Sequence, residues 1–304
     1  MMLDVIVLGG GAAGLNAALY AARKELSVGI IAEGIGGQIM NTKDVDNYLG
    51  LAAIAGYELV ERFRAHAEKF SIQWMTGRIA GVTVKDDGTF AVATADGETY
   101  EAKTCIIATG RQSRKLGLPG EDTLAARGVS YCATCDGPFY RNKRVVVVGG
   151  GDSAVEAAID LSKVASEVHI LIRSRLRADE LLVRKMRAEQ SVREWHHVIP
   201  VAVNGERKVE SLTVRNTDTN EESLIETDGV FVEIGGEPNT AFVPAELALS
   251  KEREIIVDRS GATNIPGLFA AGDVTDYPQR QIIIAAADGA KAALAAHAFL
   301  LHAE

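Results

Sequence analysis

The sequence has few cysteines and no obvious membrane-spanning run. Three cysteines among 304 residues are too few, and odd in number, for the disulfide framework of a small secreted protein. The N-terminal segment 1–8 carries no basic stretch, and its apolar run stops at Gly9. We therefore expect neither a signal peptide nor a membrane anchor, which favours a cytoplasmic protein without a membrane partner.

Basic charge is also in short supply. Lys and Arg number 32 against 41 Asp and Glu, which gives a net charge of −9. An acidic chain is poorly suited to the phosphate backbone, so we expect no nucleic-acid partner. The 47% of hydrophobic residues and 24% of charged residues are ordinary for a globular protein, and the length suits two domains.

One structural pattern occurs twice along the chain. The apolar run 4–8, the glycine cluster after it, the alanine-rich stretch 12–22 and the run 27–32 predict a βαβ unit with a parallel sheet. From residue 144 the pattern starts again. We therefore predict an α/β fold with two Rossmann-like dinucleotide-binding domains, each a parallel sheet with helices and a small β-meander.

The remaining predicted elements fill out the two copies. The tail 240–304 is too short for a domain of its own and must complete one of the copies, but the pattern does not decide which. The first copy has a helix at 56–70, a meander at 78–103 and a buried strand at 104–108; the second has strands at 145–148 and 168–172, helices at 154–163 and 179–189, and a meander at 197–234; the tail has a strand at 268–271 and a helix at 281–301.

The first glycine cluster fits the dinucleotide-binding spacing G-x-G-x-x-G at Gly9, Gly11 and Gly14. The first glycine permits the turn, the second lets the backbone approach a pyrophosphate, and the third lets helix and strand pack closely. Glu33 follows the next strand and is placed to bind a ribose hydroxyl. The alternative is a glycine-rich turn without a ligand, but the strand–turn–helix context favours nucleotide binding.

The second cluster is a G-x-G-x-x-A variant in the same context. Its residues are Gly149, Gly151, Asp152, Ser153 and Ala154. Two dinucleotide folds in one chain predict two dinucleotides, a flavin and a nicotinamide. The alternative is a second fold that has become a scaffold only.

Two of the three cysteines form a C-x-x-C pair, Cys132 and Cys135, between the two glycine clusters. This spacing lowers the pKa of one thiol and can close a reducible disulfide, which suits exchange chemistry. The alternative is half of a zinc site, which needs two more ligands. Only Cys105 remains, inside a predicted strand, and the histidines show no ligand spacing, so we predict a redox dithiol and no metal.

Other polar residues near these motifs have two interpretations each. Asp136 follows the dithiol and is either a proton shuttle or a turn residue. A basic cluster follows the second strand of the second copy and either binds a phosphate or forms a solvated face. His169 and the pair at 196–197 are interpreted as structural or surface residues. The basic cluster consists of Arg173, Arg175 and Arg177.

Taken together, these residues resemble the low-molecular-weight thioredoxin reductase family over essentially the whole chain. The element Cys-Ala-Thr-Cys-Asp-Gly at 132–137 between two dinucleotide folds is the most specific likeness. The segment 281–285 is also similar to the reductase part of the alkyl hydroperoxide reductase flavoprotein, which carries an extra N-terminal region. The other matching stretches are 36–38, 45–48, 108–110, 116–120, 128–144 and 270–273.

The resemblance implies that the tail returns to the first copy. A discontinuous FAD-binding domain would then comprise 1–114 and 243–304, with an NAD(P)-binding-type domain at 115–242 inserted in it and carrying the cysteine pair. Asp273 would bind the ribityl–phosphate region of the flavin. The residues implied or predicted to hold FAD are Gly9, Gly11, Ala12, Ala13, Gly14, Glu33, Gly37, Gln38, Asn47, Ala108, Thr109, Gly110, Gly272, Asp273, Arg280 and Gln281.

The resemblance also implies roles for the dithiol. Cys135 would face the isoalloxazine, Cys132 would attack the disulfide of a partner such as thioredoxin, and Asp136 would donate a proton. A homodimer is implied, as is a domain rotation that presents the nicotinamide and the dithiol to the flavin in turn.

The electron donor is the point at which the sequence departs from the family. Members that use NADPH carry His-Arg-Arg after the second strand of the inserted domain, whose arginines pair with the 2′-phosphate. Here Ile172 and Ser174 replace the histidine and the second arginine. The basic cluster favours NADPH, while ferredoxin or another reduced donor is the alternative.

We therefore predict a flavoenzyme that passes electrons from NADPH through FAD to the Cys132–Cys135 disulfide and on to a protein disulfide. A peroxiredoxin-type disulfide reductase is a close alternative. A ferredoxin–NADP reductase-like flavoprotein would need no dithiol, and a redox sensor without turnover would not need both glycine clusters intact.

Overall fold

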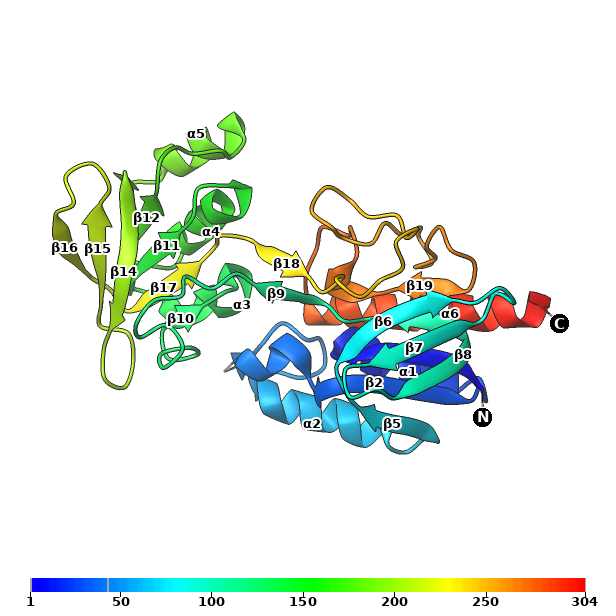
Figure 1. Ribbon diagram of the computed structural model, residues 1–304. Helices are drawn as coiled ribbons and strands as arrows, with labels where there is room; N and C mark the ends of the chain where they lie inside the picture. The colour runs from blue at the N-terminus through cyan, green and yellow to red at the C-terminus, as the bar shows by residue number, and fades with distance from the viewer. Residues whose placement is uncertain (1, 43, 304) are drawn as a thin grey trace. The chain divides into compact units, whose positions relative to one another are not determined.

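The computed structural model describes residues 2–42 and 44–303, which fold into two compact units (Figure 1). Unit 1 comprises Met1–Gln112 and Glu237–Glu304, and unit 2 comprises Ser113–Gly236. The chain passes between them through β9 (Arg111–Ser113) and β18 (Gly236–Pro238), which pair with each other. Both boundaries lie earlier than the predicted residues 114 and 243 because these paired strands mark the crossing.

Unit 1 is built on a seven-stranded sheet in the order β5-β2-β1-β8-β7-β6, with β19 also paired to β8. The strands β5, β2, β1, β8 and β19 run parallel, and β6 and β7 form an antiparallel hairpin beside β8. Their bounds are β1 Leu3–Gly10, β2 Val28–Ile35, β5 Ile72–Thr76, β6 Ile79–Val84, β7 Phe90–Thr94, β8 Thr99–Ile107 and β19 Leu268–Ala270.

The prediction that the first meander and the next buried strand are separate was wrong. They form one strand, β8, whose first half pairs antiparallel with β7 and whose second half pairs parallel with β1 and β19. The alternating pattern ends where Cys105, Ile106 and Ile107 begin, and these are fully buried. The change of pattern marks the change from a half-exposed to a buried part of one strand.

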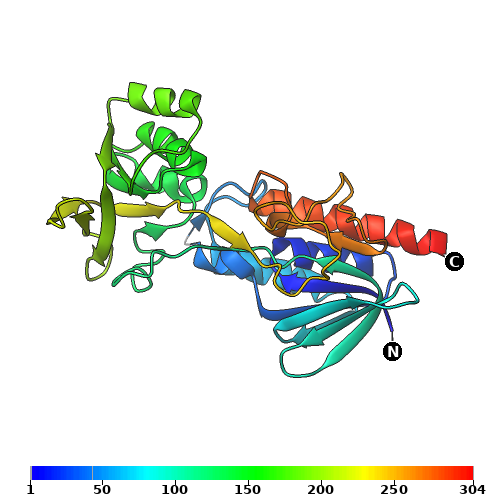
Figure 2. The ribbon, with the colours of Figure 1, turned by 45° about the horizontal axis from the view of Figure 1, so that its top comes forward.

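The helices of unit 1 include the C-terminal tail, which pattern alone could not assign. Helix α6 (Ile282–Ala303) packs against α1 (Ala12–Ala22), and the two lie side by side in Figures 1 and 2. The approach is close, because a Cβ on Gly289 would lie 2.0 Å from the Ala13 carbonyl oxygen. Smaller elements of unit 1 are α2 (Gly56–Ala67), η1 (Gly37–Asn41), β3 (Asp44–Val45), β4 (Ile54–Ala55) and η3 (Gly272–Val274).

Helix α6 is long and apolar enough to cross a membrane by length and composition. It also contacts α1, β8, β19 and η3 within unit 1, and Ala292, Ala293 and Ala296 on it are buried. Small side chains on the buried face let the helix approach its neighbours, as expected for a packing helix of a domain core.

Unit 2 has a five-stranded parallel sheet in the order β10-β17-β11-β12-β13 and a three-stranded antiparallel meander, β14-β15-β16. The predicted meander at 197–234 was wrong at its end, because β17 joins the parallel sheet. The elements are β10 Val129–Ser130, α3 Ala133–Asp136, η2 Gly137–Tyr140, β11 Arg144–Val148, α4 Asp152–Ser162, β12 Glu167–Ile172, α5 Glu180–Ala188, β13 Val192–His196, β14 Val198–Asn204, β15 Ser211–Asn216, β16 Glu222–Glu226 and β17 Gly229–Val232.

Candidate active site

The first glycine turn lies between β1 and α1 in unit 1. A Cβ on Gly9 would lie 2.4 Å from the Ala108 carbonyl oxygen, and a Cβ on Gly14 would lie 1.9 Å from the Gly9 carbonyl oxygen, so both positions require glycine. A Cβ on Gly11 would meet nothing within 4 Å. Gly11 caps α1 without a side-chain hydrogen bond, so this helix N-terminus combines open space with backbone donors, which suits a phosphate.

Residues distant in sequence gather around this turn. Gly37 lies next to Gly11, because a Cβ on Gly37 would be 3.6 Å from the Gly11 Cα. Gly272 lies against the start of α1, where its Cβ would be 3.0 Å from that of Ala13. The structure therefore brings together the segments around Gly11, Gly37, Ala108 and Gly272, all from the predicted FAD set.

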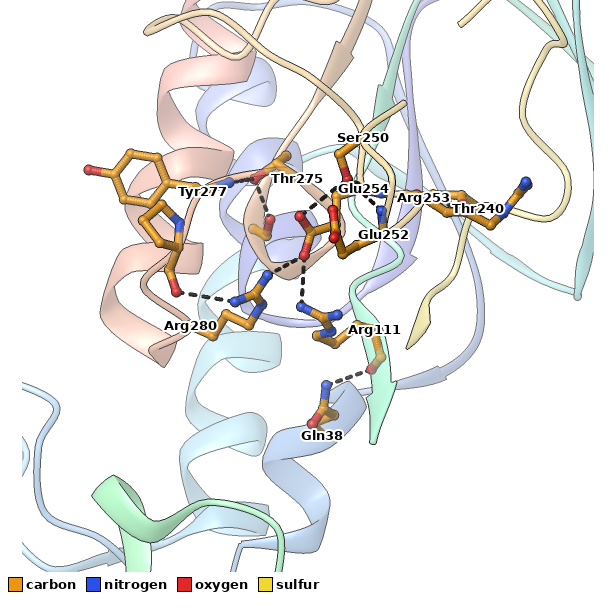
Figure 3. A network of polar contacts seen from close by, with 12 residues as sticks. Gln38, Arg111, Thr240, Ser250, Glu252, Arg253, Glu254, Thr275, Tyr277 and Arg280 are labelled. Atoms are coloured by element: carbon orange, nitrogen blue, oxygen red, sulfur yellow. Dashed lines mark hydrogen bonds and ion pairs between the residues drawn. The ribbon is translucent and has the colours of Figure 1, made fainter. Parts of the chain in front are cut away.

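A buried charge cluster lies in the same unit beside η3 (Figure 3). Glu254 Oε1 accepts a hydrogen bond from Arg111 Nη1 at 3.1 Å and from Arg280 Nη2 at 2.5 Å. Burial raises the pKa of Asp273, while the charges of Arg280 and Arg111 oppose that rise. Gln38 Nε2 donates to the Arg111 carbonyl oxygen at 2.5 Å. The sequence predicted Arg280, Asp273 and Gln38 here but missed Arg111 and Glu254.

The other predicted FAD residues lie nearby or at the surface. Asn47 Nδ2 donates to Gln281 Oε1 at 3.1 Å. Thr109 and Asn239 exchange hydrogen bonds of 2.9 Å, which fix the segment 108–110. Glu33 is exposed at the end of β2, so its predicted ribose contact has no support from a neighbouring protein group.

The residues of unit 1 fit FAD. Gly11 leaves room for a pyrophosphate at the N-terminus of α1. Arg280 Nε is buried and has no hydrogen-bond acceptor among the residues that the structure describes. A buried donor without a partner is costly, and FAD carries phosphate and carbonyl oxygens that would supply an acceptor.

The second glycine turn lies between β11 and α4 in unit 2 and repeats the first. A Cβ on Gly149 would lie 2.3 Å from the Glu233 carbonyl oxygen and 2.7 Å from the Cβ of Ala154, whereas a Cβ on Gly151 would meet nothing within 4 Å. Gly151 caps α4 without a side-chain hydrogen bond. The second turn therefore keeps the open space of a phosphate site.

The loop that carries the predicted phosphate-binding arginines lies against this second turn. Arg177 N donates to the Gly150 carbonyl oxygen at 2.7 Å, and Asp179 N donates to Asp152 Oδ1 at 2.8 Å. The side chains of Arg173, Arg175 and Arg177 are exposed. The predicted basic cluster is thus placed beside the glycine turn, on the surface of unit 2.

The dithiol lies at the start of α3 in unit 2, where Cys132 and Cys135 form a disulfide. Cys132 is the N-cap of α3, and its Sγ accepts a hydrogen bond from Cys135 N at 3.2 Å. Ser130, which the sequence analysis missed, donates to Asp136 Oδ2 at 2.6 Å and accepts from Cys132 N at 3.1 Å. One hydroxyl therefore links the carboxylate to the backbone of the first cysteine.

The third cysteine has no such surroundings. Cys105 is free and fully buried in β8, where burial raises the pKa of its thiol far above the usual value. A thiol that does not ionise is neither a nucleophile nor a metal ligand. Its interpretation as a small buried hydrophobe is confirmed.

The histidines also follow their structural interpretation. His169 Nδ1 accepts a hydrogen bond from Trp195 Nε1 at 2.9 Å, on adjacent strands β12 and β13. Burial lowers the pKa of His169, which favours the neutral ring that this acceptor role requires. His196 and His197 lie at the surface, each beside a carboxylate.

Glu233 is a titratable neighbour of the dithiol helix that the sequence analysis missed. Its Oε1 accepts from Ala133 N at 3.4 Å, at the first residue of α3. Burial, with a smaller effect from the charge of Glu156, raises its pKa from 4.5 to about 7. A sequence signal is lacking, because the carboxylate meets α3 only through the fold.

The raised pKa of Glu233 predicts a pH dependence of stability. The folded state binds this proton more tightly than the unfolded state, so its contribution is present below about pH 4.5 and is lost as the pH rises to about 7. The Glu233→Gln variant should lack this loss, which amounts to about 3 kcal/mol in the free energy of unfolding. Denaturant unfolding across pH 4–8 checks this, with Glu222→Gln at an exposed position of β16 as control. Parallel curves for wild type and Glu233→Gln would contradict the assignment.

Comparison with known proteins decides the family. The chain matches the family described as pyridine nucleotide-disulphide oxidoreductase over residues 3–293. The chain belongs to this family. It is therefore a flavin-dependent oxidoreductase of the class that uses FAD and a pyridine nucleotide, and the predicted family and fold class are confirmed.

The curated relatives are named as alkyl hydroperoxide reductases. The protein of this name from Staphylococcus aureus (strain MRSA252) is 42% identical over 299 residues, which cover 98% of this chain and 59% of that protein. The alkyl hydroperoxide reductase of Pseudomonas putida is also 42% identical, covering 98% and 58%. The chain thus spans less than two thirds of the length of these curated relatives.

Solved structures match over their full length. The thioredoxin reductase from Streptococcus pyogenes MGAS5005 has a TM-score of 0.94 and 41% identity, with 99% of each chain covered. The thioredoxin reductase from Giardia duodenalis has a TM-score of 0.93 and 31% identity, again with 99% of each chain covered.

Proposed function

We propose that the chain is a thioredoxin reductase-like enzyme that passes electrons from NADPH through FAD to the Cys132–Cys135 disulfide and on to a protein disulfide. The observation that carries the proposal is the disulfide at the start of α3, in a chain with two open glycine turns. Steady-state reduction of oxidised thioredoxin by NADPH tests it, and a flavin-loaded protein without turnover would count against it.

Unit 1 is proposed to hold FAD. Bound there, FAD supplies the step between a two-electron hydride donor and a disulfide. The N-terminus of α1 at Gly11 would bind the pyrophosphate, and Asp273 with Arg280 would bind the part of the cofactor beside η3. Support comes from the open space at Gly11 and from the unpaired Nε of Arg280.

In unit 2 the cysteines are proposed to carry out thiol–disulfide exchange. In the reduced enzyme the Cys132 thiolate attacks one sulfur of the partner disulfide and forms a mixed disulfide, while the other partner sulfur leaves as a thiolate. The Cys135 thiolate then attacks Cys132 Sγ, which re-forms the internal disulfide and releases the partner with two electrons more. Asp136 is proposed to donate a proton to a leaving thiolate, supported by its hydrogen bond from Ser130.

The second glycine turn is proposed to bind NADPH. The arginine loop packs on this turn through Arg177 N and Asp179 N, which would place Arg173 and Arg175 beside the ribose that carries the 2′-phosphate. Exposed guanidiniums are free to pair with such a phosphate.

The arginine loop predicts donor specificity. Replacing Arg173 and Arg175 with alanine should raise KM for NADPH about 10-fold to 100-fold, because each lost charge-assisted pair costs about 1.5–3 kcal/mol. The KM for NADH, which has no 2′-phosphate, should change little. Steady-state kinetics with both nucleotides separate these outcomes, and Arg184→Ala on α5 is the control. Equal effects on NADPH and NADH would show that the loop does not read the phosphate.

A second candidate substrate is supported by the relatives named as alkyl hydroperoxide reductases. In that case the partner disulfide would belong to a peroxiredoxin-type protein, with the same dithiol chemistry. Paired assays with thioredoxin and a bacterial peroxiredoxin would distinguish the two. Slow flavin reduction by both nucleotides would instead favour ferredoxin or another reduced donor.

The proposal also includes the working state of the protein. We propose a soluble, cytoplasmic homodimer whose partner is thioredoxin or a similar small dithiol protein. The exposed apolar residues of α6, Ile283, Leu294 and Leu301, support a second copy of the chain as the surface that covers them.

A further inference from the structure

Glu254 lies in a segment that the fold fixes beside Asp273. Ile255 N donates to the Val274 carbonyl oxygen at 2.9 Å, and Asp276 N donates to the Ile255 carbonyl oxygen at 3.0 Å. Ser250 Oγ accepts from the backbone N–H of Glu254 at 3.2 Å. The carboxylate is therefore held by backbone pairing that continues directly from the η3 turn.

One oxygen of this carboxylate serves two guanidinium groups (Figure 3). The side chains of Glu254, Arg111 and Arg280 are 13%, 14% and 31% exposed. Burial lowers the pKa of Arg111, and the charge of Arg280 lowers it further, while Glu254 acts in the opposite direction. Two partly buried guanidiniums repel each other unless a carboxylate lies between them, and Glu254 occupies that place.

The contact also fixes the orientation of Arg280. Its Nη2 is bound to Glu254, and its Nη1 donates to the Pro278 carbonyl oxygen at 3.2 Å. Its Nε remains buried without an acceptor among the described residues. Because a guanidinium is planar and rigid, binding two of its nitrogens sets the direction of the third.

We propose that Glu254 is a positioning residue for the flavin, which orients Arg280 and Arg111 and balances their charge where FAD binds. The inference rests on the proposed binding of FAD in unit 1. It makes no claim of contact between Glu254 and the cofactor. Its consequence is electrostatic: without the carboxylate charge, the cluster gains one positive unit, which stabilises the flavin that has received electrons.

The test compares the midpoint potential of bound flavin in Glu254→Gln and wild-type full-length protein. The isosteric amide should make the protein bind reduced flavin relative to oxidised flavin about tenfold better, which corresponds to a potential about 30 mV more positive for a two-electron couple. Glu252→Gln is the matched control, because Glu252 is exposed two residues away and should leave the potential unchanged.

A second variant separates charge from general damage. Arg111→Gln should move the potential in the opposite direction, and the double variant Glu254→Gln/Arg111→Gln should return it close to the wild-type value. An unchanged potential in a flavin-loaded Glu254→Gln protein would overturn the inference, as would a double variant that behaves like Glu254→Gln alone. Failure of the proposed function is distinct, since the wild type itself would then not bind added FAD.

Discussion

Cys132→Ser and Cys135→Ser variants should lose protein-disulfide reduction by on the order of 10³-fold or more in kcat/KM. The structure joins these two sulfurs in one disulfide at the start of α3, and a serine hydroxyl can neither close that bond nor replace a thiolate as nucleophile. Because the predicted FAD residues lie in unit 1, both variants should purify yellow and accept electrons from NADPH. Steady-state kinetics with oxidised thioredoxin give the loss, and absorbance gives the flavin content.

Cys105→Ala is the natural control for this experiment. Cys105 is a fully buried thiol in the sheet of unit 1, so its loss should lower stability slightly and leave turnover intact. If the double variant Cys132→Ser/Cys135→Ser still reduced the partner, the proposed function would be wrong.

The second large effect is expected from single methyl groups at the two open glycines. Gly11→Ala should weaken FAD binding by about 10²-fold, because its methyl group would occupy the space proposed for the pyrophosphate. The apo fold should tolerate the change, since that methyl group meets nothing within 4 Å and Gly11 has φ −78°. Titration of apoprotein with FAD, together with circular dichroism, measures both properties.

Gly151→Ala provides the reciprocal test in unit 2. Its methyl group also meets nothing within 4 Å, so the variant should fold, bind FAD normally and lose rapid reduction of the flavin by NADPH. Gly34→Ala is the control for both, because it too has open space but lies outside the glycine turns. The opposite pattern, with FAD lost in Gly151→Ala and kept in Gly11→Ala, would reverse the proposed assignment of the two units.

The features that the sequence predicted well are local ones. The glycine turns require particular spacings because the backbone of Gly9 and Gly149 approaches carbonyl oxygens that no side chain could tolerate. The Cys132–Cys135 disulfide is likewise closed within one helical turn. Such requirements are visible in sequence order, which is why these sites were found without a structure.

The missed features depend on contacts between distant segments. Arg111 and Glu254 are separated by 143 positions, and Glu233 reaches Ala133 across 100 positions. Strand boundaries failed for the same reason. Nothing within β8 states that one half pairs with a hairpin and the other with the parallel sheet, because pairing is chosen by the whole fold.

The most direct test of the central claim counts electrons in an anaerobic reductive titration of the flavin-loaded protein. If the Cys132–Cys135 disulfide exchanges electrons with the flavin, the wild type should take up two electrons more per flavin than the Cys132→Ser/Cys135→Ser variant. Addition of oxidised thioredoxin should then reoxidise the flavin of the wild type only. Equal uptake by both proteins, with equal reoxidation, would contradict the account.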